Sequence, residues 1–497
     1  MKGTNHGLKY IMSNHIIPSV EFHRTIPERR TPDELKKIAH IKRFLELLTG
    51  DRKFREQLKA NPDQANQIAK SRGLILELKN FSRKFQPGLL YDGNDPEFPL
   101  AVLWREWIDD LIKFRSMLRE DGYSSSADPR FNAWRKRQVE RTNNEMGAVR
   151  GDAITHPIFS FELSKGCSVG CWFCALGAKS FEGYYQRTPK NVSLWREILN
   201  TSVELFGSAV QTCFCYWASE PFDNPNYLDF LQDYKDIVGV LPQTTSAVPT
   251  RDLVWTRRLM EMIKAGNALP SRFSILNSKI LRDVHKLFSP EELLRNELLM
   301  QLKDSSYGKA RAGKTLNKVN SEGKKEAGLQ VNEGVSSIAC VSGYLVSMTD
   351  RTIKLVSPCQ ASEQWPMGFR IHDEGTFGDA EEFGAFITGS ISKHMPVSLP
   401  IDKPVTFRKG LIYEHAENGF ILSSQASAHS FTGDEFVVQL GDMIEEEIHN
   451  PVQIISALVD SGADIFGVRG TLNDLFEKGF LEDLPTMLFR CGYEKLQ

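Results

Sequence analysis

The sequence predicts a mixed α/β protein of three regions, and three observations lead to that prediction. Helix-like segments fill residues 1–150, strands alternate with helices over 151–400, and residues 401–497 run from strands into helices. Alternation of strand and helix is typical of a parallel sheet with crossover helices. A chain of 497 residues is long enough for two or three domains, each with its own core.

The first region is predicted to be helical. Residues 31–34 combine a threonine cap, a first-turn proline and a capping-box glutamate, and an apolar stripe then runs to Gly50. Shorter helices are expected to begin at Asp51 and Asn61. A longer helix is predicted near residues 100–119.

Strands and helices alternate in the second region. The strands are expected at 157–163, 210–216, 241–246 and 272–276, and the helices at 193–206, 226–237, 251–265 and 290–302. Residues 303–333, rich in Lys, Gly, Ser and Asn, are interpreted as a basic linker, either a solvated connector or a patch for a partner. Residues 337–359 are expected to carry a hairpin that turns at 349–351.

The third region has strand-like and then helical patterns. The strands are expected at 405–414 and 420–424, and the helices at 436–447, 451–459 and 465–478. Glu445, Glu446 and Glu447 make one of these helices acidic, whereas a helix that reads DNA carries basic residues. This pattern favours a peptide over nucleic acid as the partner.

Composition excludes several classes of protein. Apolar residues make up 41% and charged residues 25% of the chain, as in an ordinary globular protein, and the net charge of −2 does not indicate nucleic acid or an anionic membrane. The amino terminus lacks the apolar core of a signal peptide, and no run approaches membrane-spanning length. Eight cysteines are too few for a disulfide scaffold. We expect a soluble cytoplasmic protein without nucleic-acid or membrane partners.

The most informative motif is a loop of three cysteines, Cys167, Cys171 and Cys174, spaced C-x3-C-x2-C. Three thiolates can hold three corners of a cubic iron–sulfur cluster and leave one iron open to a small molecule. A four-thiolate site would need a fourth cysteine nearby, and Cys213 lies beyond a predicted helix. A zinc knuckle or a chance group of buried thiols is the alternative.

This loop resembles that of the radical SAM superfamily, and Phe173 before the last cysteine fits the same family. The resemblance implies a partial (β/α)6 barrel with its active site at the carboxyl ends of the strands. It also implies a [4Fe–4S] cluster and S-adenosyl-L-methionine, whose reduction yields a 5′-deoxyadenosyl radical. An electron donor such as flavodoxin or ferredoxin is implied as a partner.

The same resemblance indicates residues that bind S-adenosylmethionine. Ala218, Ser219 and Glu220 stand where the superfamily usually has a Gly-Gly-Glu-Pro run for the methionyl ammonium, with both glycines replaced here. A carboxylate near an ammonium is chemically apt. Residues at the ribose and carboxylate positions of the superfamily, each also explicable as an ordinary strand-end polar residue, are Thr245, Ser246, Arg272 and Ser274.

Of the next four cysteines in the chain, the first two are interpreted as structural and the other two as candidates for chemistry. Cys213 and Cys215 are interpreted as core residues, because free cysteine packs as a small hydrophobe. Cys340 and Cys359 lie on or beside the predicted hairpin, where a thiol can return a hydrogen atom to a carbon radical. Here the sequence resembles the peptidyl epimerases that mature ribosomally made, proteusin-type peptides, over segments 167–178, 220–221, 272–277 and 357–368.

That resemblance implies conversion of L- to D-residues in a precursor peptide, with Cys359 as the first candidate for hydrogen donor and Cys340 in reserve. A buried, unreactive thiol is the alternative for Cys359. It also implies that residues 401–497 form a winged-helix-like domain that binds the leader of the precursor. Segment 44–74 is similar to certain leader segments, although a plain three-helix decoration explains it equally well. Rival functions are thioether or carbon–carbon crosslinking, and a non-catalytic peptide carrier.

Overall fold

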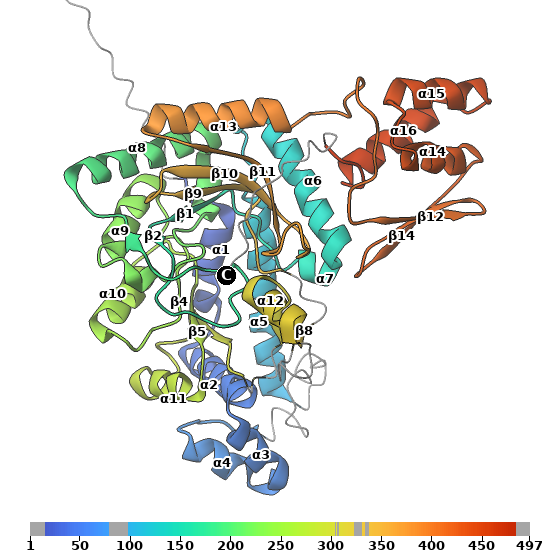
Figure 1. Ribbon diagram of the computed structural model, residues 1–497. Helices are drawn as coiled ribbons and strands as arrows, with labels where there is room; N and C mark the ends of the chain where they lie inside the picture. Colours follow the sequence, from blue (N-terminus) through green and yellow to red (C-terminus); the bar gives the residue numbers. More distant parts are fainter. Residues whose placement is uncertain are drawn as a thin grey trace, which may run out of the picture.

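The computed structural model describes residues 15–78, 98–303, 305, 308–322, 331–332 and 337–483. Over these ranges helices surround several small sheets, which confirms the mixed α/β class (Figure 1). The strands described do not close into a barrel. None of the helices in these ranges combines the length and the apolar character that a membrane crossing needs. Cys491 lies outside the described residues.

The amino-terminal region is helical, as predicted. The capping box forms, because the Thr31 hydroxyl accepts from the N–H of Glu34 at 3.2 Å and the Glu34 carboxylate accepts from the N–H of Thr31 at 2.8 Å. Segment 44–74 packs as short helices against the start of α5. The helices are α1 (Pro18–Thr25), α2 (Pro32–Gly50), α3 (Arg52–Ala60), α4 (Ala65–Ser71), α5 (Pro99–Glu120), α6 (Pro129–Met146) and α7 (Ala148–Gly151).

A four-stranded sheet forms one wall of the α/β region. Its order is β1-β9-β10-β11, with β1 and β9 parallel and the other pairs antiparallel. The predicted hairpin is confirmed as β9 and β10, with Arg351 at a φ of 54° in the turn. The strands are β1 (Phe159–Glu162), β9 (Gly343–Ser347), β10 (Thr352–Pro358) and β11 (Phe369–Thr376).

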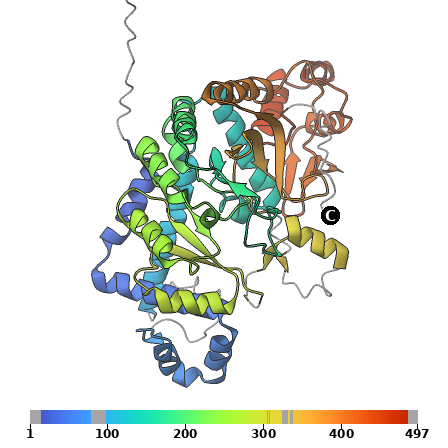
Figure 2. The same cartoon turned by 60° about the vertical axis from the view of Figure 1, so that its left-hand side comes forward.

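A parallel sheet of order β4-β5-β6 continues this wall. Phe214 links the two sheets, because it forms isolated parallel bridges with Ser160 of β1 and with Gln243, just before β4. Helices cover the outer side of both sheets and bury a large core against them (Figure 2). These elements are β4 (Thr245–Ser246), β5 (Ser271–Ile275), β6 (Asn296–Met300), α8 (Pro189–Phe206), α9 (Tyr227–Val238), α10 (Leu253–Lys264), α11 (Ser278–Leu287) and α13 (Ala380–His394).

Two predictions for this region are wrong. Residues 210–216 do not form a full strand, because Gly207, at a φ of 56°, ends α8 and the chain turns at once into a 3₁₀ helix, Gly207–Thr212. Residues 290–302 do not form a helix. Asn277 caps α11 instead, accepting from the N–H of Ile280 at 2.9 Å, and alternating burial over Asn296–Met300 makes β6. Short apolar runs of this kind suit helix and strand alike.

The stretch interpreted as a solvated linker contains secondary structure, so that interpretation is wrong for residues 309–322. It includes β7 (Lys309–Ala310), α12 (Gly313–Glu322) and β8 (Val331–Asn332). Ala310 and Ala312 pack against Ala175 of the cysteine loop, and Leu316 of α12 is buried. Small apolar side chains spaced among lysines do not reveal this packing until their partner surface is known.

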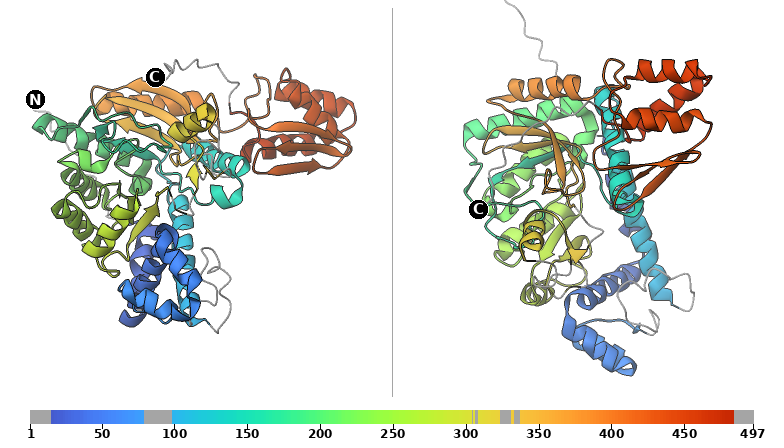
Figure 3. Two further views of the ribbon diagram at one scale, coloured as in Figure 1. Left: turned by 60° about the horizontal axis from the view of Figure 1, so that its bottom comes forward. Right: turned by 45° about the vertical axis from the view of Figure 1, so that its right-hand side comes forward.

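Residues 401–483 form a carboxy-terminal module that projects to one side of the α/β region (Figure 3). Three antiparallel strands precede three helices around their own core. The predicted strand 405–414 is shorter than expected, and its first half forms isolated bridges, Phe407 with Leu481 and Lys409 with Leu411. The elements are β12 (Ile412–Ala416), β13 (Gly419–Ser423), β14 (Ala428–Thr432), α14 (Phe436–Glu445), α15 (Pro451–Asp460) and α16 (Ile465–Glu477).

Candidate functional site

The three cysteines of the motif lie on one loop that follows β1 and precedes α8. A short antiparallel pair, β2 (Ser164–Lys165) and β3 (Gly183–Tyr184), frames the loop. Gly166 and Gly170 take φ values of 72° and 63°, which glycine adopts without the steric cost of a side chain. A Cβ on Gly166 would lie 2.1 Å from the carbonyl oxygen of Ser180. The turns of this cysteine loop therefore require the glycines of the motif.

The thiols of the cysteine loop interact with one another. All three are half-buried. Burial, and then the neighbouring Cys167 and Cys174, raise the pKa of the Cys171 thiol to about 11. Three ionised thiols repel each other, and a bound cationic group relieves that repulsion. The donor set thus fits a soft metal or an iron–sulfur cluster.

The spacing of the thiols bears on which group they fit. Within the ranges that the structure describes, no three Cys, His, Asp or Glu side chains stand close enough to hold a single metal ion between them. A cubic cluster makes a different demand, because each thiolate binds a different iron and the ligands stand farther apart. The absence of a single-ion site among the described residues therefore does not bear on a cluster.

Asp223 anchors the cysteine loop at Ser168. Its carboxylate accepts hydrogen bonds from the N–H of Ser168, at 2.8 Å, and from the hydroxyl of the same serine. Arg251 lies 3.9 Å from the carboxylate oxygen that accepts from the Ser168 hydroxyl, and it donates to that hydroxyl at 3.3 Å. The role of Asp223 was not predicted from the sequence. Its only signal is a position three residues after Glu220, and that position does not indicate that the side chain faces the loop.

Glu220 is buried, with 2% of its surface exposed, and it lies beside the cysteine loop. One carboxylate oxygen accepts from the N–H of Ala247 at 2.8 Å and the other from the N–H of Phe222 at 3.2 Å. Burial raises the pKa of Glu220 to about 7, and its charge in turn raises the pKa of Cys167 and Cys171. The structure therefore brings this predicted residue to the cluster cysteines.

The other predicted residues near Glu220 occupy different settings. Ser246 is fully buried, and its hydroxyl accepts from the N–H of Val248 at 3.2 Å, so it faces the protein interior. Ala218 and Ser219 are half-buried between Trp217 and Glu220. Of these residues, Ser219 has the most open polar side chain for a ligand.

Polar side chains also share one face of the second sheet. In β5 and β6 every second residue packs with α11. Arg272, Ser274 and Glu297 alternate with those residues and so occupy the opposite face. Arg272 Nε donates to the Glu297 carboxylate at 2.9 Å. Burial alone would lower the pKa of Arg272, but Glu297 more than offsets it and the pKa is raised. This pairing keeps the guanidinium charged.

Tyr216 extends this polar face toward β4. Its hydroxyl and that of Thr245 are 2.7 Å apart, and it also donates to Gln243 at 3.3 Å. Arg272 is close enough to lower the pKa of the tyrosine, which burial raises to about 12. Thr245 and Arg272, both predicted, thus meet Tyr216, which the sequence pattern did not single out because tyrosine is common on buried strands.

The two candidate donor thiols lie in different places. Cys340 packs at the edge of an apolar cluster on the inner face of the sheet, which includes Trp217 and Leu176 of the cysteine loop. Arg272 is near enough to act on the pKa of Cys340, although burial dominates and raises that pKa to about 12. Cys340 therefore belongs to the same interior as Arg272 and the cysteine loop.

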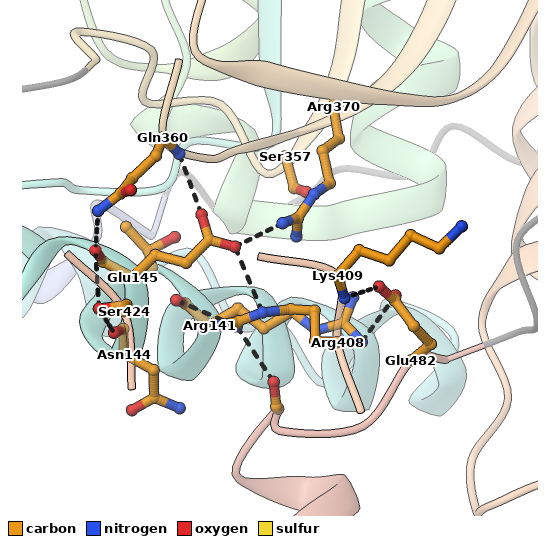
Figure 4. A network of polar contacts seen from close by, with 12 residues as sticks. Arg141, Asn144, Glu145, Ser357, Gln360, Arg370, Arg408, Lys409, Ser424 and Glu482 are labelled. Carbon is orange, nitrogen blue, oxygen red and sulfur yellow. Dashed lines mark hydrogen bonds and ion pairs between the residues drawn. The ribbon is translucent and has the colours of Figure 1, made fainter. Parts of the chain in front are cut away.

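Cys359 is 1% exposed and has other neighbours. Burial raises its pKa to about 12, and the charges closest to it are those of Arg370, Glu145 and Arg408. Gln360, the next residue, donates its N–H to Glu145 of α6 at 3.0 Å (Figure 4). The apolar cluster around Cys340 does not include Cys359. The structure thus places Cys359 at the junction with α6 and the carboxy-terminal module.

Residues 309–322 cover the cysteine loop. The N–H of Lys314, at the start of α12, donates to the carbonyl of Cys174 at 3.0 Å. Phe173, predicted beside the cluster, lies beneath the ammonium of Lys309 at 4.9 Å, and its carbonyl accepts from the Thr315 hydroxyl at 3.2 Å. Burial lowers the pKa of Lys309 to about 8. This cover fixes the half of the loop that Asp223 does not hold.

Fold and site together define a mixed α/β protein whose three-thiol loop lies beside a buried carboxylate at the ends of parallel strands. The chain belongs to the same family as the uncharacterized protein y4wI of Sinorhizobium fredii (strain NBRC 101917 / NGR234). The two share 37% identity over 481 residues, which is 96% of this chain and 93% of that protein. No family model matches the chain.

One solved structure shows a limited likeness, the crystal structure of BtrN in complex with AdoMet and 2-DOIA. The alignment has a TM-score of 0.22 and 10% sequence identity, and it covers 29% of this chain and 56% of that one. A likeness of this extent determines neither the fold nor the chemistry of the chain.

Proposed function

We propose that the protein is a radical SAM peptide epimerase that converts L- to D-residues in a ribosomally made precursor peptide. The observation that carries the proposal is the cysteine loop, whose three half-buried thiols act on one another and lie beside Glu220. No fourth cysteine of the chain falls on this loop, so a cubic cluster bound there keeps one iron for S-adenosylmethionine.

Cys167, Cys171 and Cys174 would hold the [4Fe–4S] cluster. A cluster held there would supply the electron for reductive cleavage of S-adenosylmethionine, the source of the radical that abstracts hydrogen. The protein contributes position and exclusion of water, as with other cofactors that carry the hard chemistry. Asp223 binds the loop at Ser168, and α12 binds it through the hydrogen bond from Lys314 to the carbonyl of Cys174. The two contacts restrain the positions of the three sulfur atoms.

The polar face around Tyr216, Thr245 and Arg272 suits the remainder of S-adenosylmethionine. It offers hydroxyl groups for a ribose and a guanidinium for a carboxylate. Glu220 accepts hydrogen bonds from the N–H groups of Phe222 and Ala247, which fix the position of its carboxylate. This carboxylate would pair with the methionyl ammonium. We read the two sheets joined through Phe214 as the open, partial (β/α)6 barrel of the superfamily.

Epimerisation needs a hydrogen donor on the face opposite the abstraction. Burial keeps both Cys340 and Cys359 protonated at neutral pH, so each retains the hydrogen atom that a donor must give. Cys340 lies near Arg272 and packs with Leu176 of the cysteine loop, whereas the charges closest to Cys359 are those of Arg370, Glu145 and Arg408. We therefore place Cys340 first as donor and keep Cys359 as the second candidate.

Hydrogen return changes bonds at the donor cysteine and at Cα of the peptide. The S–H bond breaks and a new C–H bond forms at Cα, which leaves a sulfur radical on the cysteine. One electron from an external one-electron donor, such as a flavodoxin or ferredoxin, and one proton from solvent restore the thiol. The peptide itself changes configuration without a change in mass.

The decisive experiment is turnover in D2O. The anaerobically reconstituted enzyme is incubated with S-adenosylmethionine, a reductant and a peptide encoded beside its gene. We expect 5′-deoxyadenosine and deuterium at Cα of D-residues. Loss of mass from the peptide would indicate crosslinking instead, and binding without any 5′-deoxyadenosine would indicate a carrier.

Variants at the two thiols then identify the donor. We expect Cys340→Ala to abolish incorporation of deuterium while 5′-deoxyadenosine still forms. Cys359→Ala serves as the matched control, because it removes a thiol whose pKa is also raised by burial. The reverse result would return the role of donor to Cys359.

A further inference from the structure

We propose that an apolar patch at the turn between α15 and α16 docks a basic, amphipathic segment of the peptide substrate. The patch consists of Val452, Val459, Ile465 and Phe466 and is called the turn patch below. The proposal rests on the proposed function, because it assumes that the partner is a peptide. The turn patch is separate from the cysteine loop and would recognise the charge and the apolar face of the docked segment.

The turn patch is exposed although its residues are large and apolar. Phe466 is 79% exposed, Val452 56%, Ile465 42% and Val459 36%. Val452 and Val459 are seven residues apart on α15 and so share one face of the helix. Soluble proteins seldom expose apolar residues together unless the surface binds something.

Geometry brings the two helices together at this patch. Only residues 461–464 separate α15 from α16, and the turn is closed by hydrogen bonds of 2.9 Å from Gly462 to Val459 and from Ala463 to Leu458. Val459 therefore stands on one side of a tight turn and Phe466 on the other. The ring of Phe436, from α14, lies 3.6 Å from where a Cβ on Gly467 would be, which extends the apolar surface to a third helix.

The core of the module does not need these residues. Ile454 and Leu458 of α15, and Val468 and Leu472 of α16, already fill the contact between the helices and are almost fully buried. The patch residues project from the other faces. Their apolar character therefore has no use inside the module.

Charge indicates what covers the patch. Residues 401–483 include fifteen acidic residues and five lysines or arginines, whereas the whole chain has a net charge of only −2. Asp460 is the last residue of α15 and Asp464 lies in the turn, and both are exposed. A surface of this kind attracts a partner with positive charge around an apolar face. It repels nucleic acid, and a second copy would set its own turn carboxylates against these.

The position of the patch suits a docking surface. The carboxy-terminal module is anchored to α6 near the end of α16, where Asp483 pairs with Arg137 at 2.6 Å and with Arg141 at 3.0 Å. The turn patch lies at the opposite end of that helix, about 18 Å away for thirteen residues. Figure 3 shows the module projecting to one side of the α/β region. A docked segment would leave the cysteine loop free for another part of the same peptide.

The test is direct binding to the full-length protein without S-adenosylmethionine. Three fluorescent synthetic peptides serve as probes: a Leu/Lys helix with one apolar face, a scramble of that sequence without such a face, and a Leu/Glu helix. We expect the first to bind, the scramble to bind about tenfold more weakly, and the acidic helix not to bind. Equal binding of the helix and its scramble would mean charge attraction alone and would overturn the proposal.

Variants then locate the site. We expect Phe466→Ser to weaken binding of the Leu/Lys helix about tenfold. Ile412→Ser removes a side chain that is 62% exposed from the same module and should leave Kd unchanged. Val452→Ser repeats the test at a second patch residue, and melting curves of all variants check that the module stays folded. If Phe466→Ser and Ile412→Ser behave alike, the turn patch is not the site.

Charge variants complete the test. Asp460→Asn with Asp464→Asn should weaken binding about threefold, whereas Glu414→Gln with Glu417→Gln, an equal loss of charge on the β12–β13 hairpin, should not. Asparagine still caps α16, where Asp464 accepts from Gly467 at 2.7 Å. Arg469→Gln, which removes the positive charge one turn further along α16, should tighten binding.

Sedimentation of the same variants addresses the other occupant. A dimer that dissociates on Phe466→Ser would mean that a second copy covers the patch, and the proposal would fall. Because binding is measured without S-adenosylmethionine, failure here leaves the radical chemistry standing. Absence of 5′-deoxyadenosine in turnover would likewise leave the docking result intact.

Discussion

Glu145 and Arg370 form an ion pair of 2.5 Å between α6 and β11, and little of either side chain reaches solvent. The same carboxylate lies 3.3 Å from Arg408 of the carboxy-terminal module and accepts from the N–H of Gln360, next to Cys359. Three segments far apart in the chain thus meet at one carboxylate (Figure 4). Through it, the sheet and the module are held in a fixed relation to α6.

Glu145→Gln should destabilise the protein strongly. Glutamine retains the shape of the side chain but removes the nearest counter-charge of Arg370 and Arg408, and breaking a buried ion pair costs about 3–5 kcal/mol. Urea unfolding followed by tryptophan fluorescence measures the loss. Glu140→Gln, a half-buried position on the same helix, is the control. Equal stability of the two variants would refute the role of Glu145.

The junction between α6 and the module should fail in acid and not near neutrality. Burial alone would raise the pKa of Glu145 and of Asp483, but Arg370 and Arg141, among others, more than offset it and hold both below their usual range. A lowered pKa in the folded state stabilises at pH values above the carboxyl pKa of the unfolded chain, about 4, and this contribution is lost as the pH falls through the folded value.

Melting temperature against pH measures this dependence. We expect a steep fall below about pH 4, with the module becoming sensitive to protease at the same point, and a milder slope near pH 6 from histidines that burial keeps neutral, such as His156 and His372. Glu145→Gln should show a weaker fall, because one of the two carboxylates is gone. An equally steep fall in wild type and Glu145→Gln would contradict this account.

Asp223→Ala should loosen the cysteine loop. The variant removes both hydrogen bonds to Ser168, and groups that orient metal ligands typically change metal retention about tenfold. Iron and sulfide per chain, measured after anaerobic reconstitution and dialysis, report the effect. Asp229→Ala, which breaks an exposed pair with Arg258, is the control. Unchanged iron in Asp223→Ala would show that the loop holds its shape alone.

Features with a local cause could be predicted from the sequence. The capping box at Thr31, the hairpin turn at Arg351 and the cysteine loop each depend on neighbouring residues, and each forms in the structure. The segments that were mistaken are short apolar runs, such as 290–302, where the periodicity suits helix and strand alike.

Contacts between distant segments could not be predicted. Asp223 meets Ser168 across 55 residues, and Gln360 meets Glu145 across 215. Nothing in the local pattern of an aspartate or a glutamate reveals such a partner, because the pairing depends on how the strands and helices pack. The same limit explains why Cys340 and Cys359 looked alike in the sequence yet occupy different surroundings.

Gly313→Ala should separate the cover of residues 309–322 from the cysteine loop. Gly313 has a φ of 53°, and a Cβ there would lie 2.4 Å from the carbonyl oxygen of Ala175 and 2.5 Å from that of Cys174. The backbone strain alone costs about 1–2 kcal/mol, and the clash must in addition move α12 or the loop. The bond from the Lys314 N–H to Cys174 would then be lost.

We expect this variant to lose iron faster after reconstitution and to expose the loop to protease. Gly470→Ala is the matched control, because that glycine lies inside α16 with no atom within 4 Å of its Cβ position. Alanine there should leave iron unchanged and stabilise the helix by about 0.5–1 kcal/mol. If Gly313→Ala retains iron as the wild type does, α12 merely rests on the loop and Asp223 alone determines its geometry.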